Sequence, residues 1–257
     1  MWRFAILFCL AASTCADIAL GASDNNAHIS TNSNCLKVGL DEDVGKKTLN
    51  VLSPVLKRMY ERAGHCISFE VAPSFRITRM FKNGQLDAEF LRSVGSFSDF
   101  GDTMIAMPLP LFEVKYVLVW TDRINFDGQL QNVGGHSIGQ LRSHRAIALL
   151  LEKTSENRVV LSNLGRAIDL MKRARLDILA VDPLSADQIV NGWSGSDHKV
   201  NSQPFYTADI YHLIRKEHAG LELELAKAYR AMFHDGELDS FFNSPGLYAP
   251  SWTIDAD

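Results

Sequence analysis

The sequence predicts an α/β protein of two lobes, and three observations carry that prediction. Strand and helix patterns alternate between residues 36 and 90, and a similar alternation returns between residues 137 and 181. Both stretches contain a Leu-Asp pair that leads into their last strand, Leu86-Asp87 and Leu176-Asp177. A β-α-β-α-β order implies a mostly parallel sheet with right-handed crossovers. Two similar halves in one chain therefore favour two lobes over one continuous sheet.

The size and charge of the chain limit the class of protein. The chain has 257 residues and a formal net charge of -4. This length suits one large domain or two small ones. A nucleic-acid binder needs a basic stripe to displace counterions, and the mild acidity argues against one. We expect a monomer that binds no nucleic acid.

The first residues have the pattern of a secretory signal. A short basic start, Met1-Trp2-Arg3, precedes an uncharged apolar run over 4–12 and the small residues Thr14-Cys15-Ala16. This predicts a signal peptide over 1–16, cleaved after Ala16, and the polar stretch that follows predicts a flexible leader over 17–34. The apolar run is too short to span a bilayer, and the alternative is an anchored N-terminus.

Two of the four cysteines remain after the predicted cleavage. Cys9 and Cys15 leave with the signal, whereas Cys35 and Cys66 each precede a predicted strand. If those strands are parallel neighbours, the two sulfur atoms start at the same sheet edge. An even pair in an exported chain therefore predicts a disulfide, the alternative being two free thiols.

The first half contains the expected strands and helices in order. Ser53 and Pro54 predict the start of a helix that ends at Gly64, and Ser74 predicts the cap of a second helix ending before Gly84. Alternating apolar residues predict strands over 36–40, 67–71 and 86–90.

The second half repeats this order, and two further strands connect the halves. Strands are predicted near 137–139, 159–161 and 177–181, and helices over 146–151 and after Asn163. The connecting strands, 116–120 and 210–214, would form a two-strand hinge. An amphipathic helix follows, with Leu221, Leu225, Ala228 and Met232 on one face. We therefore expect lobe 1 to combine 35–119 with 210–257 and lobe 2 to span 120–209.

The order and spacing of several segments resemble those of extracellular solute-binding proteins of family 3, which have the type II periplasmic binding fold. The matching segments are Arg58 to Gly64, "FRITRMFKNGQLD" over 75–87, Pro108, "RARLDILAVD" over 173–182, and His218 to Phe242. The resemblance implies a periplasmic protein that captures a small polar solute, such as an amino acid, for an ABC-type importer in the inner membrane. That family also includes sensor domains and a few enzymes, so the fold does not fix the activity.

The chain departs from this family's amino-acid binders near the expected ligand site. The residues after the first strand, Asp41-Glu42-Asp43-Val44, lack the family's aromatic ring, and 96–102 lack its Thr-x-x-Arg. Ser143 stands where the second lobe usually has a Gly at a helix start. The expected ligand is therefore amino-acid-like or another small anionic or zwitterionic solute.

Arg92 and Asp182 are the two main candidate ligand-binding residues. Arg92 follows the third strand, at the carboxyl edge where ligands of open α/β sheets bind, and a guanidinium suits a carboxylate or phosphate. The alternative is a salt bridge with Asp87 or Glu89. The resemblance gives Asp182 the role of an amino-binding acid in lobe 2. The alternative is a helix cap before Pro183.

Four further residues are candidates for lining the cleft. Phe75 and Arg76 begin the second helix, where the family often has an aromatic in the cleft; the alternative is core packing for Phe75 and solvent exposure for Arg76. Arg142 and Ser143 precede the second lobe's first helix, whose free N–H groups attract anions. An ordinary cap by Ser143 is the alternative.

Other motifs give little support for an enzyme. Gly135-His136-Ser137-Ile138-Gly139 matches the G-x-S-x-G nucleophile elbow, which needs a strand before it and a helix after it, but here the strand follows the serine. The sequence has no H-E-x-x-H, C-x-x-C, G-x-G-x-x-G or Walker loop, so no metal or cofactor is expected. We therefore predict a non-enzymatic solute-binding protein. The alternatives are a stand-alone ligand sensor with a membrane partner and, behind it, a hydrolase using Ser137 or a lyase.

Overall fold

The computed structural model describes residues 35–42, 46–194, 197–244 and 246–256. The predicted signal peptide and leader, with Cys9 and Cys15, lie outside the described residues. By its internal contacts, the chain from residue 34 to residue 257 forms one compact unit. By its sheet topology this compact unit contains a first βα unit and a second βα unit.

The first βα unit is the predicted β-α-β-α-β array. Strand β1 pairs in parallel with β2 on one side and with β3 on the other. The alternating apolar residues place strands where they were predicted, although the third strand begins two residues later, at Ala88. In chain order the elements are β1 (Leu36–Asp41), α1 (Lys46–Arg62), β2 (Ile67–Ala72), α2 (Ser74–Lys82) and β3 (Ala88–Ser93).

Helix α1 begins earlier than the sequence indicated. Its first residue is Lys46, so Ser53 is not its cap and Pro54 lies inside it. A proline in a helix has no N–H for the carbonyl four residues before it, which is why Pro54 indicated a start. Buried Leu52, Leu56, Met59 and Tyr60 lie on both sides of the proline, and their packing stabilises the helix across it.

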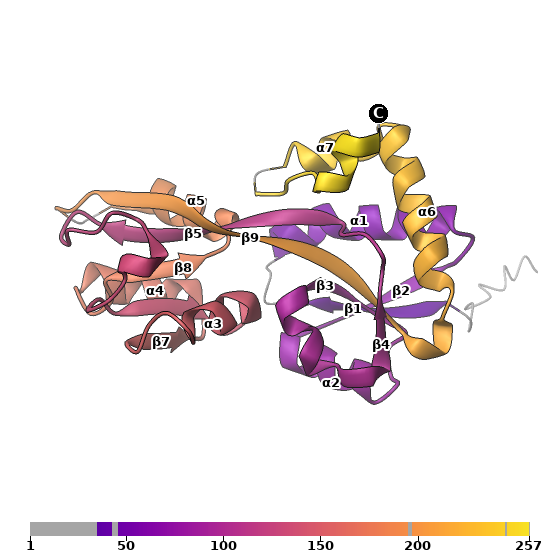
Figure 1. The fold of residues 1–257 in the computed structure, drawn as a ribbon, viewed down its shortest axis with the longest axis horizontal. Helices are drawn as coiled ribbons and strands as arrows, with labels where there is room; N and C mark the ends of the chain where they lie inside the picture. Colours follow the sequence, from indigo (N-terminus) through magenta and orange to yellow (C-terminus); the bar gives the residue numbers. More distant parts are fainter. Residues whose placement is uncertain (1–34, 43–45, 195–196, 245, 257) are drawn as a thin grey trace, which may run out of the picture. The chain divides into compact units, whose positions relative to one another are not determined.

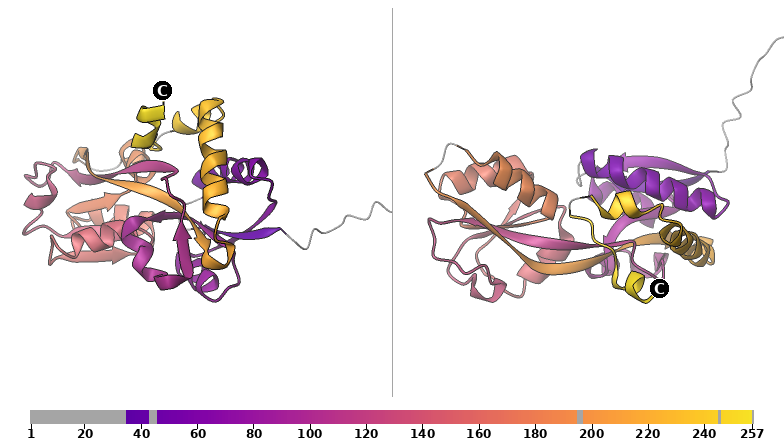
Figure 2. Two further views of the ribbon diagram at one scale, coloured as in Figure 1. Left: turned by 45° about the vertical axis from the view of Figure 1, so that its right-hand side comes forward. Right: turned by 90° about the horizontal axis from the view of Figure 1, so that it is seen from above.

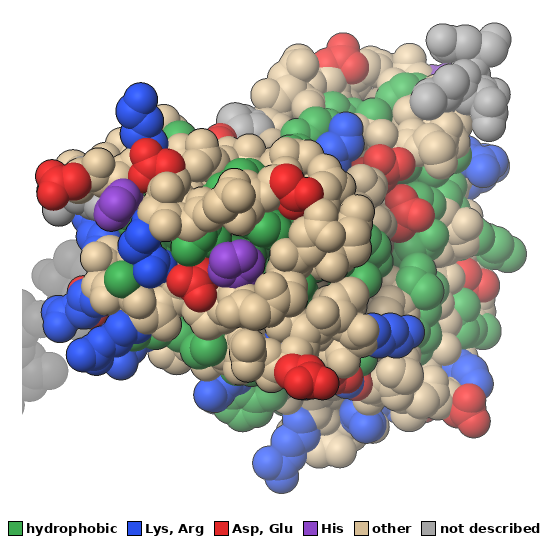
Figure 3. All heavy atoms as spheres, turned by 60° about the vertical axis from the view of Figure 1, so that its left-hand side comes forward, with side chains coloured by type: hydrophobic (Ala, Val, Ile, Leu, Met, Phe, Trp, Pro, Cys, Tyr) green, Lys and Arg blue, Asp and Glu red, His purple; other side chains and the backbone are tan. Residues whose placement is uncertain are grey.

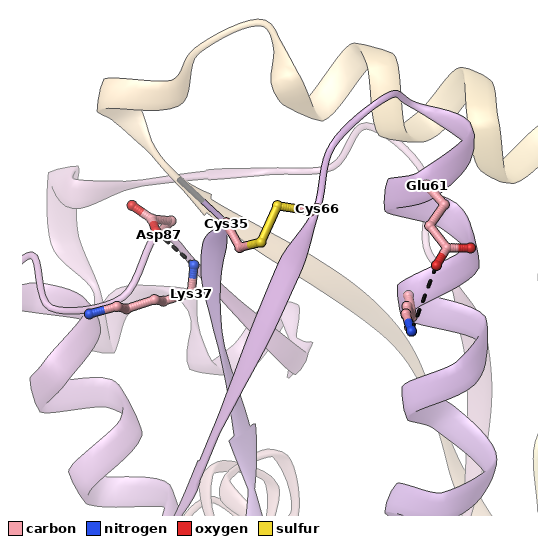
Figure 4. The surroundings of a disulfide bond; sticks show 6 residues. Cys35, Lys37, Glu61, Cys66 and Asp87 are labelled. Atoms are coloured by element: carbon pink, nitrogen blue, oxygen red, sulfur yellow. Dashed lines mark hydrogen bonds and ion pairs between the residues drawn. A yellow bond between two sulfur atoms is a disulfide. The ribbon is translucent and has the colours of Figure 1, made fainter. Parts of the chain in front are cut away.

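The predicted disulfide between Cys35 and Cys66 is present. The two Cα atoms are 4.8 Å apart, and each cysteine directly precedes one of two parallel strands. Leu36 pairs with Ile67, so the register brings both sulfur atoms to the same edge of the sheet, as Figure 4 shows. The prediction of a disulfide is therefore confirmed. The bond forms because the two cysteines occupy matching positions before neighbouring strands.

The second βα unit repeats the order of the first. Strand β6 pairs in parallel with both β7 and β8. Asn163 caps α4 as expected, because its side chain accepts a hydrogen bond from the Arg166 N–H. The elements are β6 (Ile138–Leu141), α3 (Arg145–Leu151), β7 (Arg158–Leu161), α4 (Leu164–Lys172), β8 (Ile178–Val181) and α5 (Pro183–Gly192).

Two long antiparallel strands connect the units. Strands β5 (Phe112–Thr121) and β9 (Val200–Arg215) pair along most of their length, from Phe112 with Ile210 to Thr121 with Val200. The last residues of β9 also pair with β3, and β5 pairs with β8, so the strand order is β2-β1-β3-β9-β5-β8-β6-β7. The expectation that the two halves would not share one continuous sheet is therefore wrong, because the long strands β5 and β9 join the strands of both units by hydrogen bonds. Figures 1 and 2 show both strands running from one unit into the other.

Helices cover both faces of the sheet in each unit. In β5, Leu118 and Trp120 pack into one apolar cluster with α3, while Val117 and Val119 pack into another with α4 and α5. Successive side chains of a strand point to opposite faces, so the continuous apolar run 116–120 is that of a strand buried on both sides.

The C-terminal segment packs against the first βα unit. Helix α6 (Leu221–His234) buries Leu225 and Tyr229 in the same apolar cluster as Leu56 and Met59 of α1.

On the face drawn in Figure 3, side chains of both charges are interspersed. The remaining elements are β4 (Met104–Ala106), α7 (Asp239–Phe242) and the short 3-10 helices Val94–Asp99, Gly101–Thr103, Leu130–Asn132, Lys216–His218 and Ser251–Ala256.

Candidate functional site

A cavity of about 120 Å³ is lined by residues from both βα units, and we call it the inner cavity. The first unit contributes Asp41, at the end of β1, and Arg92, in β3. The second contributes Ser143 and His144, before α3, and Asp182, before α5. The four strands β1, β3, β6 and β8 end at or just before these residues, so the cavity lies at their carboxyl ends, which is where open α/β sheets bind ligands.

Arg92 is buried and held by acidic and hydroxyl groups of its own unit. Its side chain is 8% exposed, and it pairs with Glu89 and, at 3.6 Å, with Asp41. Its Nη1 also donates to the Ser74 hydroxyl at 3.1 Å. The salt bridge with Glu89, named above as the alternative to a ligand role, is therefore present. Arg92 lines the cavity as well, so the two roles do not exclude each other geometrically.

Glu89 is the most enclosed charged group near the cavity. Its side chain has no exposed surface, and its Oε2 has no hydrogen-bond partner. Burial raises the pKa of Glu89 to about 7, although the Arg92 guanidinium acts in the opposite direction. A buried carboxylate with one unsatisfied oxygen gains from protonation, because the charged form has lost its hydration.

Asp182 caps α5 and faces the cavity. Its Oδ1 accepts the Ser185 N–H at 2.9 Å and its Oδ2 accepts the Ser185 hydroxyl at 2.6 Å. His144 Nε2 lies 3.3 Å from Oδ2. Burial by itself would raise the pKa of Asp182, but hydrogen bonds from His144 and Ser185 outweigh it and lower the pKa to about 2. The helix cap predicted as an alternative is present, and the carboxylate is held ionised.

A second cavity, of about 300 Å³, adjoins the first, and we call it the outer cavity. Arg92 and Ser143 line both cavities, and Phe75 and Arg142 line only the outer one. Phe75 is 75% exposed, so it is not the core residue that was the alternative. Across this cavity Arg145 of α3 pairs with Asp99 of the first unit, with Nε 3.2 Å from Oδ2.

Two candidates from the sequence lie outside these cavities. Arg76 is exposed and lines neither of them. Ser137 bonds to Asp177: its Oγ lies 2.9 Å from Oδ2 and 3.0 Å from the Asp177 N–H. The strand β6 begins directly after it, so the serine does not stand between a strand and a helix as a nucleophile elbow requires. Ser137 therefore links the start of β6 to Asp177, the residue before β8.

Sequence reasoning missed Asp41 and His144 as cavity residues. Asp41 ends β1, so the carboxyl-edge rule that selected Arg92 would have selected it too. His144 carried no such signal, because its position depends on the packing of the 142–144 turn against Tyr116, whose ring lies 5.8 Å from the imidazole.

Within the described ranges, no three His, Cys, Asp or Glu side chains group as a metal site requires. Among those same residues, no helix has the length and apolar character of a bilayer span.

The comparisons with known proteins bear on the fold. No protein-family model matches the chain, and no curated protein matches its sequence. Solved structures do match. A histidine kinase sensor domain with similarity to periplasmic binding proteins superposes with a TM-score of 0.68 at 15% identity, covering 84% of this chain and 98% of that one.

Two amino-acid binders are also similar in structure. An ancestral arginine-binding protein bound to arginine matches with a TM-score of 0.62 at 17% identity, over 81% of this chain and 96% of that one. The arginine-, lysine-, histidine-binding protein ArtJ from Geobacillus stearothermophilus matches with a TM-score of 0.64 at 12% identity, over 86% and 98%. Identities this low show the fold alone. They confirm the architecture that the sequence resemblance predicted: the chain has the α/β fold of the type II periplasmic binding proteins.

Proposed function

We propose that this protein is an exported solute-binding protein that closes two lobes over one small polar ligand. The observation that carries the proposal is the inner cavity, because polar residues of both βα units line it: Asp41 and Arg92 on one side, Ser143 and Asp182 on the other. In this reading lobe 1 is 35–119 with 210–257, lobe 2 is 120–209, and β5 and β9 form the hinge. Two connecting strands allow rigid lobes to close.

Two further observations support an exported binding protein. The Cys35–Cys66 disulfide is typical of an oxidising compartment such as the periplasm. Similar structures include an arginine-binding protein and ArtJ, which are named for the amino acids they bind. The monomeric protein would deliver its ligand to an ABC permease in the inner membrane.

A sensor is the second candidate function, and one comparison favours it. The histidine kinase sensor domain has the highest TM-score of the three structures described above. A sensor would bind its ligand in the same cavity but transmit closure to a membrane partner. Deletion of the gene separates the two: loss of uptake of the bound solute supports transport, whereas unchanged uptake with an altered transcriptional response supports sensing.

Binding with closure is the test of the proposal. A thermal-shift screen of amino acids, organic acids and amines should find a ligand that stabilises the protein, by about 2.7 kcal/mol at 100 times its dissociation constant. Small-angle scattering should then show a smaller radius of gyration with that ligand. A ligand that binds without any change in the radius of gyration, or the absence of any binding compound, would count against the proposal.

A further inference from the structure

Strand β2 lies at one end of the sheet. It pairs with β1 and stands first in the strand order, so one of its two sides has no neighbouring strand among the described residues. The Cys66 carbonyl accepts the Leu36 N–H of β1, and the backbone groups of successive residues in a strand point alternately to its two sides. The N–H and C=O groups that point away from β1 are therefore those of Ile67, Phe69 and Val71. A row of such groups is a template for pairing with another strand.

The same three residues present apolar side chains at this side of the sheet. Phe69 is 37% exposed and Val71 is 49% exposed, while Ile67 is half-buried. Phe69 and Val71 stand beside Val38 and Leu40 of β1, which are buried in the apolar cluster under α1. The apolar face of the sheet therefore extends to its open end. We call Ile67, Phe69 and Val71, with their outward backbone groups, the β2 edge.

The opposite end of the sheet, at β7, offers less for another strand. The Ile138 N–H donates to the Asn157 carbonyl, so the backbone groups of β7 that point outward are those of Arg158 and Val160. Arg158 is charged, and its Nη1 lies 3.6 Å from Glu152. Charged side chains on an edge strand oppose pairing with a further strand. All three outward residues of the β2 edge are apolar instead.

The β2 edge is complementary to itself. Two copies of β2 can lie antiparallel about a two-fold axis at Phe69, and Ile67 of each copy then falls opposite Val71 of the other. Opposite residues whose backbone groups face each other exchange two hydrogen bonds. The two Phe69 side chains become neighbours on the apolar face, where cross-strand aromatic and β-branched pairs are favourable. One register therefore satisfies both the outward backbone groups and the exposed apolar side chains.

The charged side chains at this end of the sheet fit the same register. Glu70 points to the other face of β2, and in the antiparallel pair it falls opposite Ser68 of the second copy. Lys37 of that copy stands beside its own Ser68 in the sheet, so each cross-strand row contains one acid and one base. Like charges directly opposite each other would weaken the pair, and this register avoids them.

From these observations we propose that the β2 edge binds the β2 edge of a second copy of this chain, so that two sheets join across a two-fold axis. No residue of β2 lines the inner or the outer cavity, so a dimer of this kind leaves both cavities open to a ligand. The inference goes beyond the proposed function and does not rest on it. A pair of short strands is a small interface, so we expect a dissociation constant of about 10–100 μM, with the monomer expected from the sequence at lower concentration.

The first experiment measures self-association of the oxidised wild-type protein. Sedimentation velocity is recorded from about 1 μM to about 500 μM, a range that spans the expected dissociation constant. The sedimentation coefficient is expected to rise with concentration from the value of a monomer to that of a dimer. A protein that stays monomeric at the highest concentration overturns the inference.

The second experiment tests the register through the residue on the two-fold axis. Phe69→Lys and Phe69→Glu each place two like charges opposite each other, so each variant alone should dimerise at least tenfold more weakly than the wild type. An equimolar mixture of the two variants pairs a lysine with a glutamate, and it should dimerise at least tenfold more tightly than either variant alone. Mixing does not repair a folding defect, so recovery in the mixture identifies the interface. Dimers of undiminished stability in either single variant, or a mixture no tighter than its components, overturn the inference.

A matched control changes the other end of the sheet. Val160→Lys, at an exposed position of β7, should dimerise as the wild type does, and loss of the dimer in this variant would overturn the inference. The outcomes also separate the two proposals. Ligand binding with closure by a strictly monomeric wild type overturns the dimer and leaves the proposed function intact. A dimer that responds to the Phe69 charge pair but binds no solute supports the inference and counts against the proposed function.

Discussion

Asp87 and Asp177 occupy equivalent places in the two βα units. The Asp87 Oδ2 accepts the Lys37 N–H of β1 at 2.7 Å, and the Asp177 Oδ2 accepts the Ser137 N–H next to β6 at 2.9 Å. Figure 4 shows the first of these bonds beside the disulfide. Each aspartate also meets a basic side chain, His218 in one unit and Arg123 in the other. The aspartate of each Leu-Asp pair therefore links the first strand of its unit to the third by a hydrogen bond.

The two aspartates should each contribute to stability. Asp177→Ala removes the acceptor of the Ser137 N–H and leaves that part-buried donor unpaired, so we expect a loss of about 1–3 kcal/mol in the free energy of unfolding. Asp87→Ala should cost a similar amount. Urea denaturation followed by circular dichroism measures both. The control is Asp169→Ala, an exposed partner of Arg173, which should change stability by less than about 0.5 kcal/mol. Equal losses at all three sites would contradict this account.

Gly39 and Gly139 also correspond, since each lies in the first strand of its unit under tightly packed side chains. A Cβ on Gly39 would lie 2.6 Å from Ile77 Cγ2, and one on Gly139 would lie 2.8 Å from Leu176 Cδ2. We expect Gly39→Ala and Gly139→Ala each to lower the melting temperature, with a cost of about 1–3 kcal/mol from overpacking. Gly134→Ala, with nothing within 4 Å, is the matched control and should be nearly neutral. Differential scanning calorimetry would refute the prediction by showing no difference from the control.

Removing Arg92 should destabilise the fold. Arg92→Leu leaves the buried Glu89 carboxylate unpaired, and breaking such a pair costs about 3–5 kcal/mol. Replacing both partners by leucine should recover much of that loss, because no buried charge remains. Denaturant unfolding of the two single variants and the double variant measures the coupling. Arg173→Leu, at an exposed ion pair, is the control.

Glu89 should also make stability depend on pH. Its pKa in the folded protein, about 7, lies above the ordinary 4.5, so the native state holds an extra proton between these values. The contribution of Glu89 to the free energy of unfolding is therefore fully present below pH 4.5, and it is lost as the pH rises to 7. Buried His212 acts in the opposite direction, because burial lowers its pKa from 6.5 to about 3. The contribution of His212 to the free energy of unfolding is therefore fully present above pH 6.5, and it is lost as the pH falls.

Glu89→Gln should separate these opposing effects. Glutamine does not titrate, so the variant should not show the fall in the free energy of unfolding that Glu89 causes between pH 4.5 and 7. The difference in unfolding free energy between the variant and the wild type should therefore grow with pH over this range, by up to about 1.4 kcal/mol per pH unit. Urea unfolding at half-unit steps of pH measures that difference. A difference that stays constant from pH 4.5 to 7 would show that Glu89 is ionised throughout.

Reduction of the disulfide should weaken the first βα unit. Cys35 and Cys66 are 31 residues apart, and closing a loop of that size contributes about 3–4 kcal/mol in the chain-entropy model. Adding dithiothreitol should therefore lower the urea midpoint of the wild type. The Cys35→Ser/Cys66→Ser variant should have the lower midpoint already and should not respond to the reductant. A midpoint that is the same with and without reductant in the wild type would contradict the estimate.

The candidate site was predicted only in part from the sequence. The carboxyl-edge rule found Arg92, and the resemblance to a solute-binding family found Asp182, and both line the inner cavity. That Arg92 donates hydrogen bonds to Glu89, Ser74 and Thr78 could not be read from the chain. Ser74 and Thr78 are on α2, and their distances to Arg92 depend on how that helix packs on β3.

The sequence by itself determined the α/β architecture, the two βα units and the disulfide. Local patterns are sufficient for these features, because alternation, helical spacing and matching positions before parallel strands are properties of short segments. Tertiary structure decided the extent of α1 across Pro54, the pairing of β9 with both β3 and β5, and the meeting of polar residues from both βα units in the inner cavity. Those features depend on contacts between segments far apart in the chain. Asp41 and Asp182, 141 positions apart in the chain, line one cavity only after the chain has folded.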